Sequence, residues 1–238
     1  MATDLTDRSL EPAGTDQYAA FEGWVRQHAT PDAVLLDVGA GDGDQPYPTN
    51  LAPSVSRIVG VDPDEGVLGN KRIDEAVHAP FEEFAAGHRE QFDLAVAVYV
   101  VEHVADPVAF ATALHGCLRP GGSAFILTPN RWHYFGLATS AASRLHVEEP
   151  ILRLVRDRPT VEEYHVPTEY RLNTIRCVRR HLAAAGFSSV EVATYEQPSM
   201  YDPYLPTAVR GLASGWHALA YRSGRPNLMG HLMIRAVR

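Results

Sequence analysis

The sequence predicts an α/β fold in which a mostly parallel, doubly wound sheet carries helices on both faces. Short apolar runs alternate with amphipathic stretches along the 238 residues. Runs such as 92–98 are nearly continuous, which is typical of strands buried on both faces. A glycine-rich segment at 39–43 follows one run, and Asp62 ends the next. Because ligands of such sheets bind beyond the carboxyl ends of the strands, both features lie where a ligand is expected.

The first half of the chain supplies most of this alternation. The apolar helical spacing after Asp16 predicts a first helix, and Pro31 forces a turn before the first strand. The expected elements are a helix over 16–28, strands over 34–38 and 57–61, a weak helix over 64–72, a short strand over 76–78, a helix over 80–86 and a strand over 92–98.

The second half begins with the best-marked helix of the chain. Asp106 is its expected N-cap and Pro107 its first residue, and Gly121-Gly122 closes the unit. The alternation then lapses over 128–170. The remaining expected elements are a strand over 123–127, a helix from 173 or 174 to 185 that stops at Gly186, a strand over 189–194, a helix over 207–221 and a final strand over 228–237.

The glycine turn has the chemistry of a nucleoside site. Residues 36–43 read Leu-Asp-Val-Gly-Ala-Gly-Asp-Gly. Glycine lets the backbone approach a ligand because it has no Cβ, and a carboxylate at Asp62 can accept both ribose hydroxyls. A dinucleotide site would have a third glycine where this chain has Asp44. Asp42 and Asp44 would repel a pyrophosphate, whereas a cationic sulfonium nucleoside tolerates acidic neighbours.

Composition narrows the class of protein. The net charge of −8 argues against sequence-independent nucleic-acid binding. Residues 1–127 hold 7 basic and 20 acidic side chains and residues 128–238 hold 14 and 9, so the second half fits an anionic or electron-rich substrate. No signal-peptide core and no run of 18 apolar residues occurs, which predicts a cytoplasmic protein without a membrane span. Cys117 and Cys177 are expected to be reduced thiols.

Four segments in this order resemble class I S-adenosylmethionine-dependent methyltransferases: 36–43, Val-Gly-Val-Asp at 59–62, Phe-Asp-Leu-Ala-Val-Ala-Val-Tyr-Val-Val-Glu-His-Val-Ala-Asp-Pro at 92–107, and Leu-Arg-Pro-Gly-Gly at 118–122. The last two point to the branch that acts on quinone precursors and other small molecules. The resemblance implies a Rossmann-like, seven-stranded sheet with an antiparallel C-terminal strand. It also implies S-adenosyl-L-methionine as methyl donor, S-adenosyl-L-homocysteine as product, and transfer to a small-molecule acceptor, most often at a hydroxyl oxygen.

The resemblance also assigns the cofactor contacts. Residues of the glycine turn would pass beneath the methionine part, Asp62 would take the ribose hydroxyls, and 78–80 would border the adenine. The cofactor-binding residues implied are Tyr18, Asp37, Gly39, Ala40, Gly41, Asp62, Pro63, His78, Ala79, Val98 and Tyr99. Many relatives carry an acid just before the adenine segment, and this chain reads Val77-His78-Ala79 there.

The acceptor side is expected in the less regular part of a single domain over 1–238. A long insert at 128–170, joined by 195–221, is interpreted as a substrate lid because such inserts usually cover binding sites. Candidate general bases are His103, His133 and His165, since a neutral imidazole suits proton removal near physiological pH. Candidate acceptor-binding residues are Arg131, His133, Tyr134, Tyr164, Tyr170 and Arg171.

Three other functions remain open from the sequence. An RNA methyltransferase would need a basic face, an NAD-dependent oxidoreductase is disfavoured by the acidic turn, and a non-catalytic cofactor-binding subunit would have the same cofactor site. Transfer to nitrogen or carbon is the alternative to oxygen. The eleven histidines show no metal-ligand spacing, so no metal is expected. Neither the acceptor nor the oligomeric state follows from the sequence.

Overall fold

The computed structural model describes residues 9–10, 17–44, 50–137, 168–197, 205 and 207–238. The strands are β1 Ser9–Leu10, β2 Val34–Val38, β3 Arg57–Asp62, β4 Glu75–His78, β5 Phe92–Val98, β6 Leu118–Pro129, β7 Ser189–Glu196 and β8 His231–Val237. The α-helices are α1 Gln17–Arg26, α2 Phe81–Gly87, α3 Pro107–Cys117, α7 Ile175–Ala185 and α9 Thr207–Ser223. Short 3-10 helices are η1 Ala52–Ser54, η2 Glu65–Gly69, η3 Val101–His103 and η5 Pro226–Leu228.

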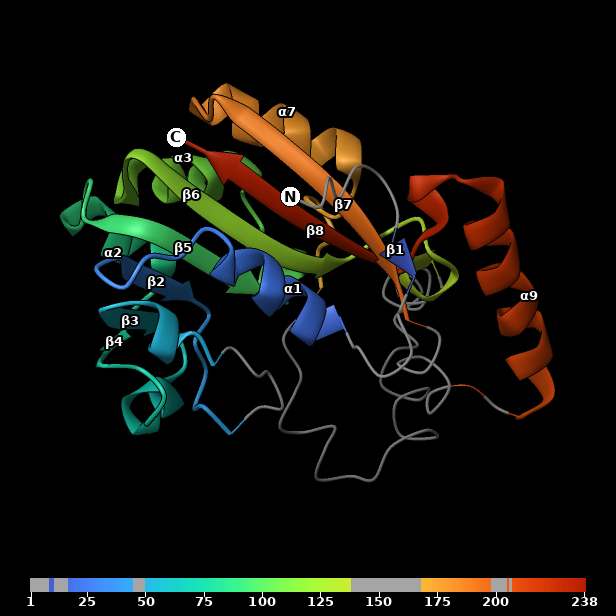
Figure 1. Ribbon diagram of the computed structural model, residues 1–238, viewed down its shortest axis with the longest axis horizontal. Coiled ribbons are helices and arrows are strands. Elements are labelled where there is room, and N and C mark those ends of the chain that lie inside the picture. Colours follow the sequence, from blue (N-terminus) through green and yellow to red (C-terminus); the bar gives the residue numbers. More distant parts are fainter. Residues whose placement is uncertain (1–8, 11–16, 45–49, 138–167, 198–204, 206) are drawn as a thin grey trace.

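All described strands lie in one sheet, in the order β4-β3-β2-β5-β6-β8-β7-β1 (Figure 1). Neighbours run parallel except at β8, which lies antiparallel between β6 and β7. The predicted doubly wound, mostly parallel sheet of seven strands with an antiparallel C-terminal strand is therefore confirmed. The two-residue strand β1 was not predicted; it extends the sheet by pairing parallel with Tyr195 and Glu196 of β7.

Apolar side chains on the two faces of the sheet form two separate cores. One core packs under α2, α3 and α7 and contains the buried side chains of Phe110 and Leu182. The other packs under α1 and contains Phe21, Trp24 and Phe125. Both faces are thus covered by helices, which explains why the strand sequences are apolar throughout instead of alternating.

Caps at the helix ends lie where the sequence places them. The carboxylate of Asp106 accepts hydrogen bonds from the backbone N–H groups of Val108 and Ala109 at 2.9 and 3.1 Å. The hydroxyl of Thr174 accepts from Cys177 N–H at 3.2 Å, which starts α7 at Ile175. Gly186 ends α7 with a left-handed φ of 109°. The Asp106 and Thr174 side chains satisfy backbone N–H groups at the helix starts, and the backbone N–H of Gly186 bonds carbonyls of the last turn of α7.

Several boundaries differ from the prediction for local reasons. The predicted helix over 64–72 is the shorter η2. The Asp64 carboxylate caps its start by accepting from Gly66 N–H, and the helix ends before Asn70, whose side-chain amide donates to Ala40 O. The helix expected to reach residue 28 ends at Arg26, and its expected cap Asp16 lies outside the described residues. Strand β6 starts at 118 instead of 123. A bulge over 119–122 makes this extension possible, since the register with β5 shifts there.

Two further expectations can be compared with the fold. Cys117 and Cys177 are free thiols, as expected. Across the part of the chain that is described, no helix has both the length and the apolar character needed to cross a membrane.

Candidate cofactor and acceptor site

The glycine turn after β2 has a left-handed backbone, which favours glycine. Gly39 and Gly41 have φ values of +74° and +55°. A Cβ added to Gly39 would lie 2.3 Å from Cγ2 of Val100. The turn is fixed to the next strand because Gly39 N–H donates to Val61 O at 2.8 Å and Gly41 N–H donates to the Asp62 carboxylate at 3.0 Å. Gly39 is therefore required by sterics as well as by any ligand.

Asn70 holds this turn from the opposite side and was missed by the sequence analysis. Its side-chain amide donates to Ala40 O at 3.0 Å and to Gly41 O at 3.1 Å, and its Oδ1 accepts from Arg72 N–H at 2.9 Å. A Cβ on Gly43 would lie 2.5 Å from Asn70 Oδ1. A polar residue directly after the η2 glycines was the only sequence signal for this role.

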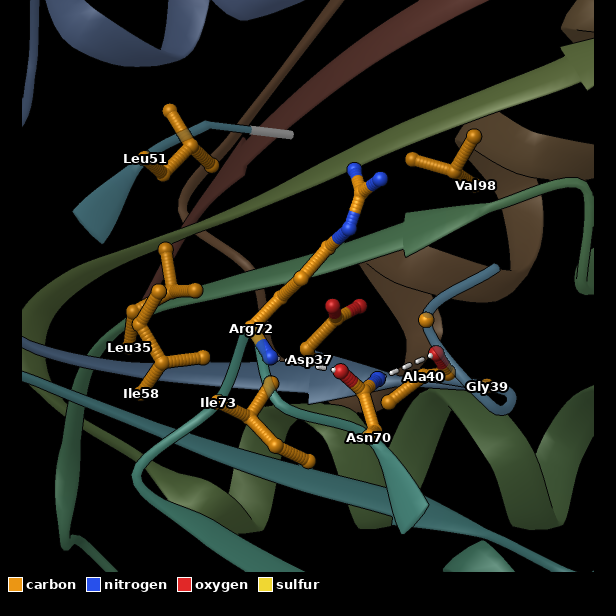
Figure 2. Close-up of a pocket in the computed structure, with 11 residues that line it drawn as sticks. Leu35, Asp37, Gly39, Ala40, Leu51, Ile58, Asn70, Arg72, Ile73 and Val98 are labelled. Atoms are coloured by element: carbon orange, nitrogen blue, oxygen red, sulfur yellow. Dashed lines mark hydrogen bonds between the residues drawn. The ribbon is translucent and has the colours of Figure 1, made fainter. Parts of the chain in front are cut away.

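A pocket opens beside the glycine turn, where β2 and β5 end, and is also lined by Ile58 of β3 and by residues 70, 72 and 73 (Figure 2). Its polar residues are Asp37, Asn70 and Arg72, and the Arg72 side chain extends across the pocket past Asp37. Arg72 was also missed by the sequence analysis. The lining residues are Leu35, Asp37, Gly39, Ala40, Gly43, Leu51, Ile58, Asn70, Arg72, Ile73 and Val98.

Two carboxyl groups lie near the glycine turn: Asp37 lines the pocket, and Asp62 bonds the turn from the end of β3. Burial, and the nearby charge of Asp62, raise the pKa of Asp37 to about 7. Asp62 itself accepts two backbone N–H groups, one per oxygen, from Gly41 at 3.0 Å and from Asp64 at 2.8 Å. A carboxylate has about four acceptor positions, so Asp62 retains two for a ligand. A cation beside Asp37 would relieve the cost of ionising it.

The predicted adenine-bordering residues come together at the ends of β3 and β4. Asp62 pairs with His78 in the sheet, and Ala79 N–H donates to Asp62 O at 3.0 Å. The His78 ring nitrogen Nε2 lies 3.0 Å from Pro63 O. The structure thus groups Asp62, Pro63, His78 and Ala79 at the ends of β3 and β4. None of the four is among the residues that line the pocket.

The residues expected beneath the sulfonium lie at the end of β5. Val98 lines the pocket, and Tyr99 has a left-handed φ of 55°, which is uncommon for a residue with a side chain. The ring of Tyr18 packs edge-on against the ring of Tyr99, with centroids 5.7 Å apart. The Tyr99 hydroxyl accepts from the side-chain amide of Gln17 at 3.3 Å. Helix α1 and β5 therefore meet at this corner.

A buried carboxyl lies next to the predicted base His103. Burial raises the pKa of Glu102 to about 7, and its carboxyl accepts from the Thr128 hydroxyl at 3.0 Å. Asn173 in turn donates to Thr128 Oγ1 at 2.6 Å. This chain of hydrogen bonds joins η3, β6 and the segment before α7. His103 is half-buried on η3 and is not among the residues that line the pocket.

The predicted acceptor residues fall into separate groups. Arg131 donates to Tyr170 O at 3.3 Å, so these two lie together. Arg171 is exposed and bonds Glu169 at 3.0 Å and Ala105 O at 2.9 Å. The ring of Tyr134 packs on that of His133, with centroids 4.2 Å apart. Tyr164 and His165, and most of the predicted lid over 128–170, lie outside the described residues.

His133 belongs to a buried group that the sequence did not reveal. It lies near Glu196 at the end of β7 and His217 on α9, and all three side chains are at most 8% exposed. Their separation in the chain leaves no local spacing to recognise. In the sequence, the acid Glu196 at the end of the apolar run of β7 was the one feature that could have indicated this buried group.

Residues 16–230 match the model of a methyltransferase domain family. The chain belongs to this family. Its fold and the order of its motifs are those expected of a class I methyltransferase, as the sequence predicted.

This methyltransferase is similar to two curated relatives over part of its length. It is 34% identical over 105 residues to a ubiquinone biosynthesis O-methyltransferase from Aromatoleum aromaticum, a match that covers 41% of this chain and 44% of that protein. It is 38% identical over 105 residues to the protein of the same name from Ruegeria pomeroyi, covering 41% of each. The chain thus spans less than half the length of these relatives.

The methyltransferase is also similar in fold to an S-adenosylmethionine-dependent methyltransferase structure from Mesorhizobium loti. That match has a TM-score of 0.58 at 18% sequence identity and covers 95% of this chain and 99% of the other. At such an identity the likeness concerns the fold alone.

Proposed function

We propose that this methyltransferase binds S-adenosyl-L-methionine and transfers its methyl group to a hydroxyl oxygen of a small molecule. The observation that carries the proposal is the pair of acids at the glycine turn. Asp37 lines the pocket with its pKa raised to about 7 by burial and by Asp62. A ligand with a cationic ammonium and sulfonium neutralises this pair, whereas a pyrophosphate would add like charge.

The residues at the strand ends fit the parts of this cofactor. The two remaining acceptor positions of Asp62 match the two ribose hydroxyls. Pro63, His78 and Ala79 would border the adenine, as their grouping at the ends of β3 and β4 supports. The glycine turn would lie against the methionine part with Asp37 toward its amino group.

Three residues would hold the reactive end of the cofactor. Val98 and Tyr99 at the end of β5 would lie beneath the sulfonium, and Tyr18 lies against the Tyr99 ring. The cofactor supplies an activated methyl group with a good leaving group. The protein mainly aligns the acceptor oxygen with that methyl group and excludes water, which explains why no strong catalytic pair is needed.

The acceptor is proposed from the relatives and from charge. Two relatives are named ubiquinone biosynthesis O-methyltransferases, which supports a hydroxyl on a small, aromatic or anionic molecule. The mildly basic second half of the chain, with Arg131 beside Tyr170, suits such a molecule. His103, His133 and His165 stay predictions for the group that takes the hydroxyl proton.

Calorimetry with S-adenosylmethionine, S-adenosylhomocysteine and NAD tests the cofactor. We expect the first two to bind and NAD to give no heat. Asp62→Ala should weaken both nucleosides by about 1–3 kcal/mol, since a charged acceptor is lost. Asp32→Ala is the matched control: it removes an exposed acid before the opposite end of β2 and should leave affinity unchanged.

Two results would contradict the proposal. Binding of NAD alone would show that the site is a dinucleotide site, and equal affinity of Asp62→Ala and Asp32→Ala would remove Asp62 from it. Transfer itself is measured as release of S-adenosylhomocysteine when hydroxylated aromatic acids and quinols are supplied. Binding without release for any hydroxylated acceptor would reduce the chain to a cofactor-binding subunit.

A further inference from the structure

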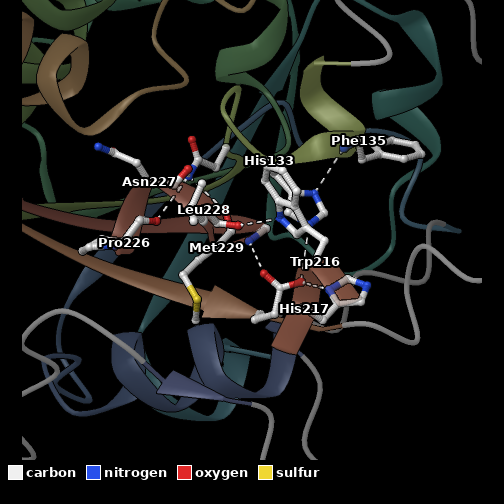
Figure 3. Close-up of polar contacts among 11 residues, drawn as sticks. His133, Phe135, Trp216, His217, Pro226, Asn227, Leu228 and Met229 are labelled. Carbon is white, nitrogen blue, oxygen red and sulfur yellow. Dashed lines mark hydrogen bonds and ion pairs between the residues drawn. The ribbon is translucent and has the colours of Figure 1, made fainter. Parts of the chain in front are cut away.

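Three buried side chains at the far end of the sheet form a compact group of donor atoms, called here the His-Glu-His cluster. It consists of His133 in the segment after β6, Glu196 at the end of β7 and His217 on α9. Figure 3 labels the two histidines. The imidazole and carboxylate donor atoms all lie within 4.8 Å of one another. The cluster therefore joins three segments that are far apart in the sequence.

Distances in the cluster suit ligands of one metal ion. His133 Nε2 lies 3.4 Å from Glu196 Oε1, which is long for a hydrogen bond. Two ligands at about 2.0–2.1 Å from a tetrahedral ion lie about 3.3–3.4 Å apart. His217 Nδ1 lies only 2.5 Å from Glu196 Oε1, so these two atoms would separate by about 0.8 Å to admit the ion.

The donor types in the cluster also match a metal site. Two imidazoles and one carboxylate are side chains that zinc and its neighbours in the first transition row accept as ligands. All three side chains are at most 8% exposed.

The surroundings hold the donors in place. The second oxygen of Glu196 accepts Gly230 N–H at 2.6 Å, an outer contact that orients the carboxylate. The rings of Tyr134 and Trp216 pack against that of His133, with centroids 4.2 and 6.1 Å away, and form an apolar wall. Phe135 N–H donates to His133 Nδ1 at 3.4 Å, so the ring would change tautomer to coordinate an ion through Nε2.

We propose that the His-Glu-His cluster binds one divalent transition-metal ion of the zinc type. The ion would cross-link α9 to the ends of β6 and β7, next to the acceptor side of the fold. Imidazole donors disfavour Mg²⁺ and Ca²⁺, which take oxygen ligands. The proposal is independent of methyl transfer, since none of the three residues lies in the pocket beside the glycine turn.

A cobalt titration of the metal-depleted, full-length chain without a histidine tag tests the site. We expect one Co²⁺ per chain with visible absorption bands, displaced by Zn²⁺ and not by Mg²⁺. Glu196→Gln and His217→Gln should weaken Co²⁺ binding by at least ~100-fold, since loss of an outer-shell partner alone costs 10–100-fold. His181→Gln, which removes a histidine of α7 outside the cluster, should bind as wild type does.

Thermal melts keep the test decisive if a variant folds poorly. Zn²⁺ should raise the melting temperature of the wild type, because an ion bound only by the folded state stabilises it, and should not raise that of either cluster variant. Absence of saturable Co²⁺ binding by the wild type would overturn the proposal and leave the cluster as a hydrogen-bonded acid between two imidazoles. Undiminished binding in both variants would overturn it too.

Discussion

Two acids on different strands of the sheet, Asp37 on β2 and Glu196 on β7, have pKa values that are shifted in opposite directions. At the cofactor end, burial and Asp62 raise the pKa of Asp37 to about 7. At the end of β7, burial would raise the pKa of Glu196, but two imidazoles hold it at about 2. The charge of Asp62 thus raises the pKa of the first acid, whereas groups within the protein lower the pKa of the second. A buried carboxyl whose neighbours raise its pKa points to a cationic ligand more directly than one whose neighbours lower it.

The regions around these two acids differ in how their parts are spread along the chain. The glycine turn, Asp62 and Asn70 lie within one stretch of about thirty residues, and backbone sterics require several of them. The His-Glu-His cluster draws its members from three distant segments. Substitutions in the two regions should therefore differ in whether they change cofactor affinity, the free energy of unfolding, or both.

The largest effect is expected at the glycine turn. Gly39→Ala places a Cβ 2.3 Å from Val100 on a backbone with φ of +74°, so it should cost about 3 kcal/mol of unfolding free energy from strain and overpacking. It should also abolish most S-adenosylhomocysteine binding. Denaturant unfolding and calorimetry measure the two losses.

Gly121→Ala is the matched control for that substitution. Gly121 has a similar φ of +84°, but nothing lies within 4 Å of its added Cβ. The control should lose only about 1–2 kcal/mol of stability, from the left-handed backbone, and no cofactor affinity. Equal losses in the two variants would show that the contact with Val100 does not matter.

A somewhat smaller effect is expected beside the His-Glu-His cluster, where Asn130 O accepts from His133 N–H. The buried side-chain amide of Asn130 donates to the carbonyls of Asn227 at 3.1 Å and Met229 at 2.9 Å. Asn130→Ala leaves these groups without that donor and should cost about 2–3 kcal/mol in denaturant unfolding. Cofactor affinity should stay unchanged, in contrast to Gly39→Ala. Asn227→Ala, whose side chain is exposed, should change stability by less than about 0.5 kcal/mol.

The smallest effect concerns pH. The Asp37 carboxyl of the free protein is protonated below its raised pKa of about 7 and ionised above it. Only the ionised form attracts the cationic cofactor, so affinity should rise about tenfold from pH 6 to pH 8. Asp37→Asn should lack this rise.

The Asn variant also corrects for the cofactor itself. Titration of the cofactor amino group affects both proteins alike, so the ratio of their affinities isolates Asp37. The raised pKa of a carboxyl makes stability fall as pH rises from about 4 to 7, and Asp37→Asn should flatten that fall in thermal melts. A constant affinity ratio between pH 6 and 8 would place the ionised group elsewhere.

Most of the fold and the cofactor side could be predicted from the sequence. Runs buried on both faces, the cap at Asp106 and the stop at Gly186 each follow from a local requirement that leaves a local pattern. The turn at 39–43 and Asp62 also came together as predicted, because parallel strands end at one edge of a sheet.

The remainder depends on contacts between distant residues. Asn70 supports the glycine turn from the next loop, and its amide has no motif of its own. Glu196 and His217 meet only because β8 lies between β6 and β7 and α9 packs at the strand ends. The bulge over 119–122 likewise follows from pairing of β6 with β5, since Leu118 alone gives no sign that the strand has begun.

The position of β8 also constrains the order in which the chain can fold during synthesis. Residues 231–237 form β8, which lies between β6 and β7. Until this segment leaves the ribosome, β6 and β7 both lack the strand that joins them. Until then β6 exposes an unpaired edge of Ala124, Phe125 and Ile126, a sequence suited to pairing with another chain. Deletion of β8 would therefore be expected to cause aggregation of the nascent protein, even though every residue of the cofactor pocket precedes it.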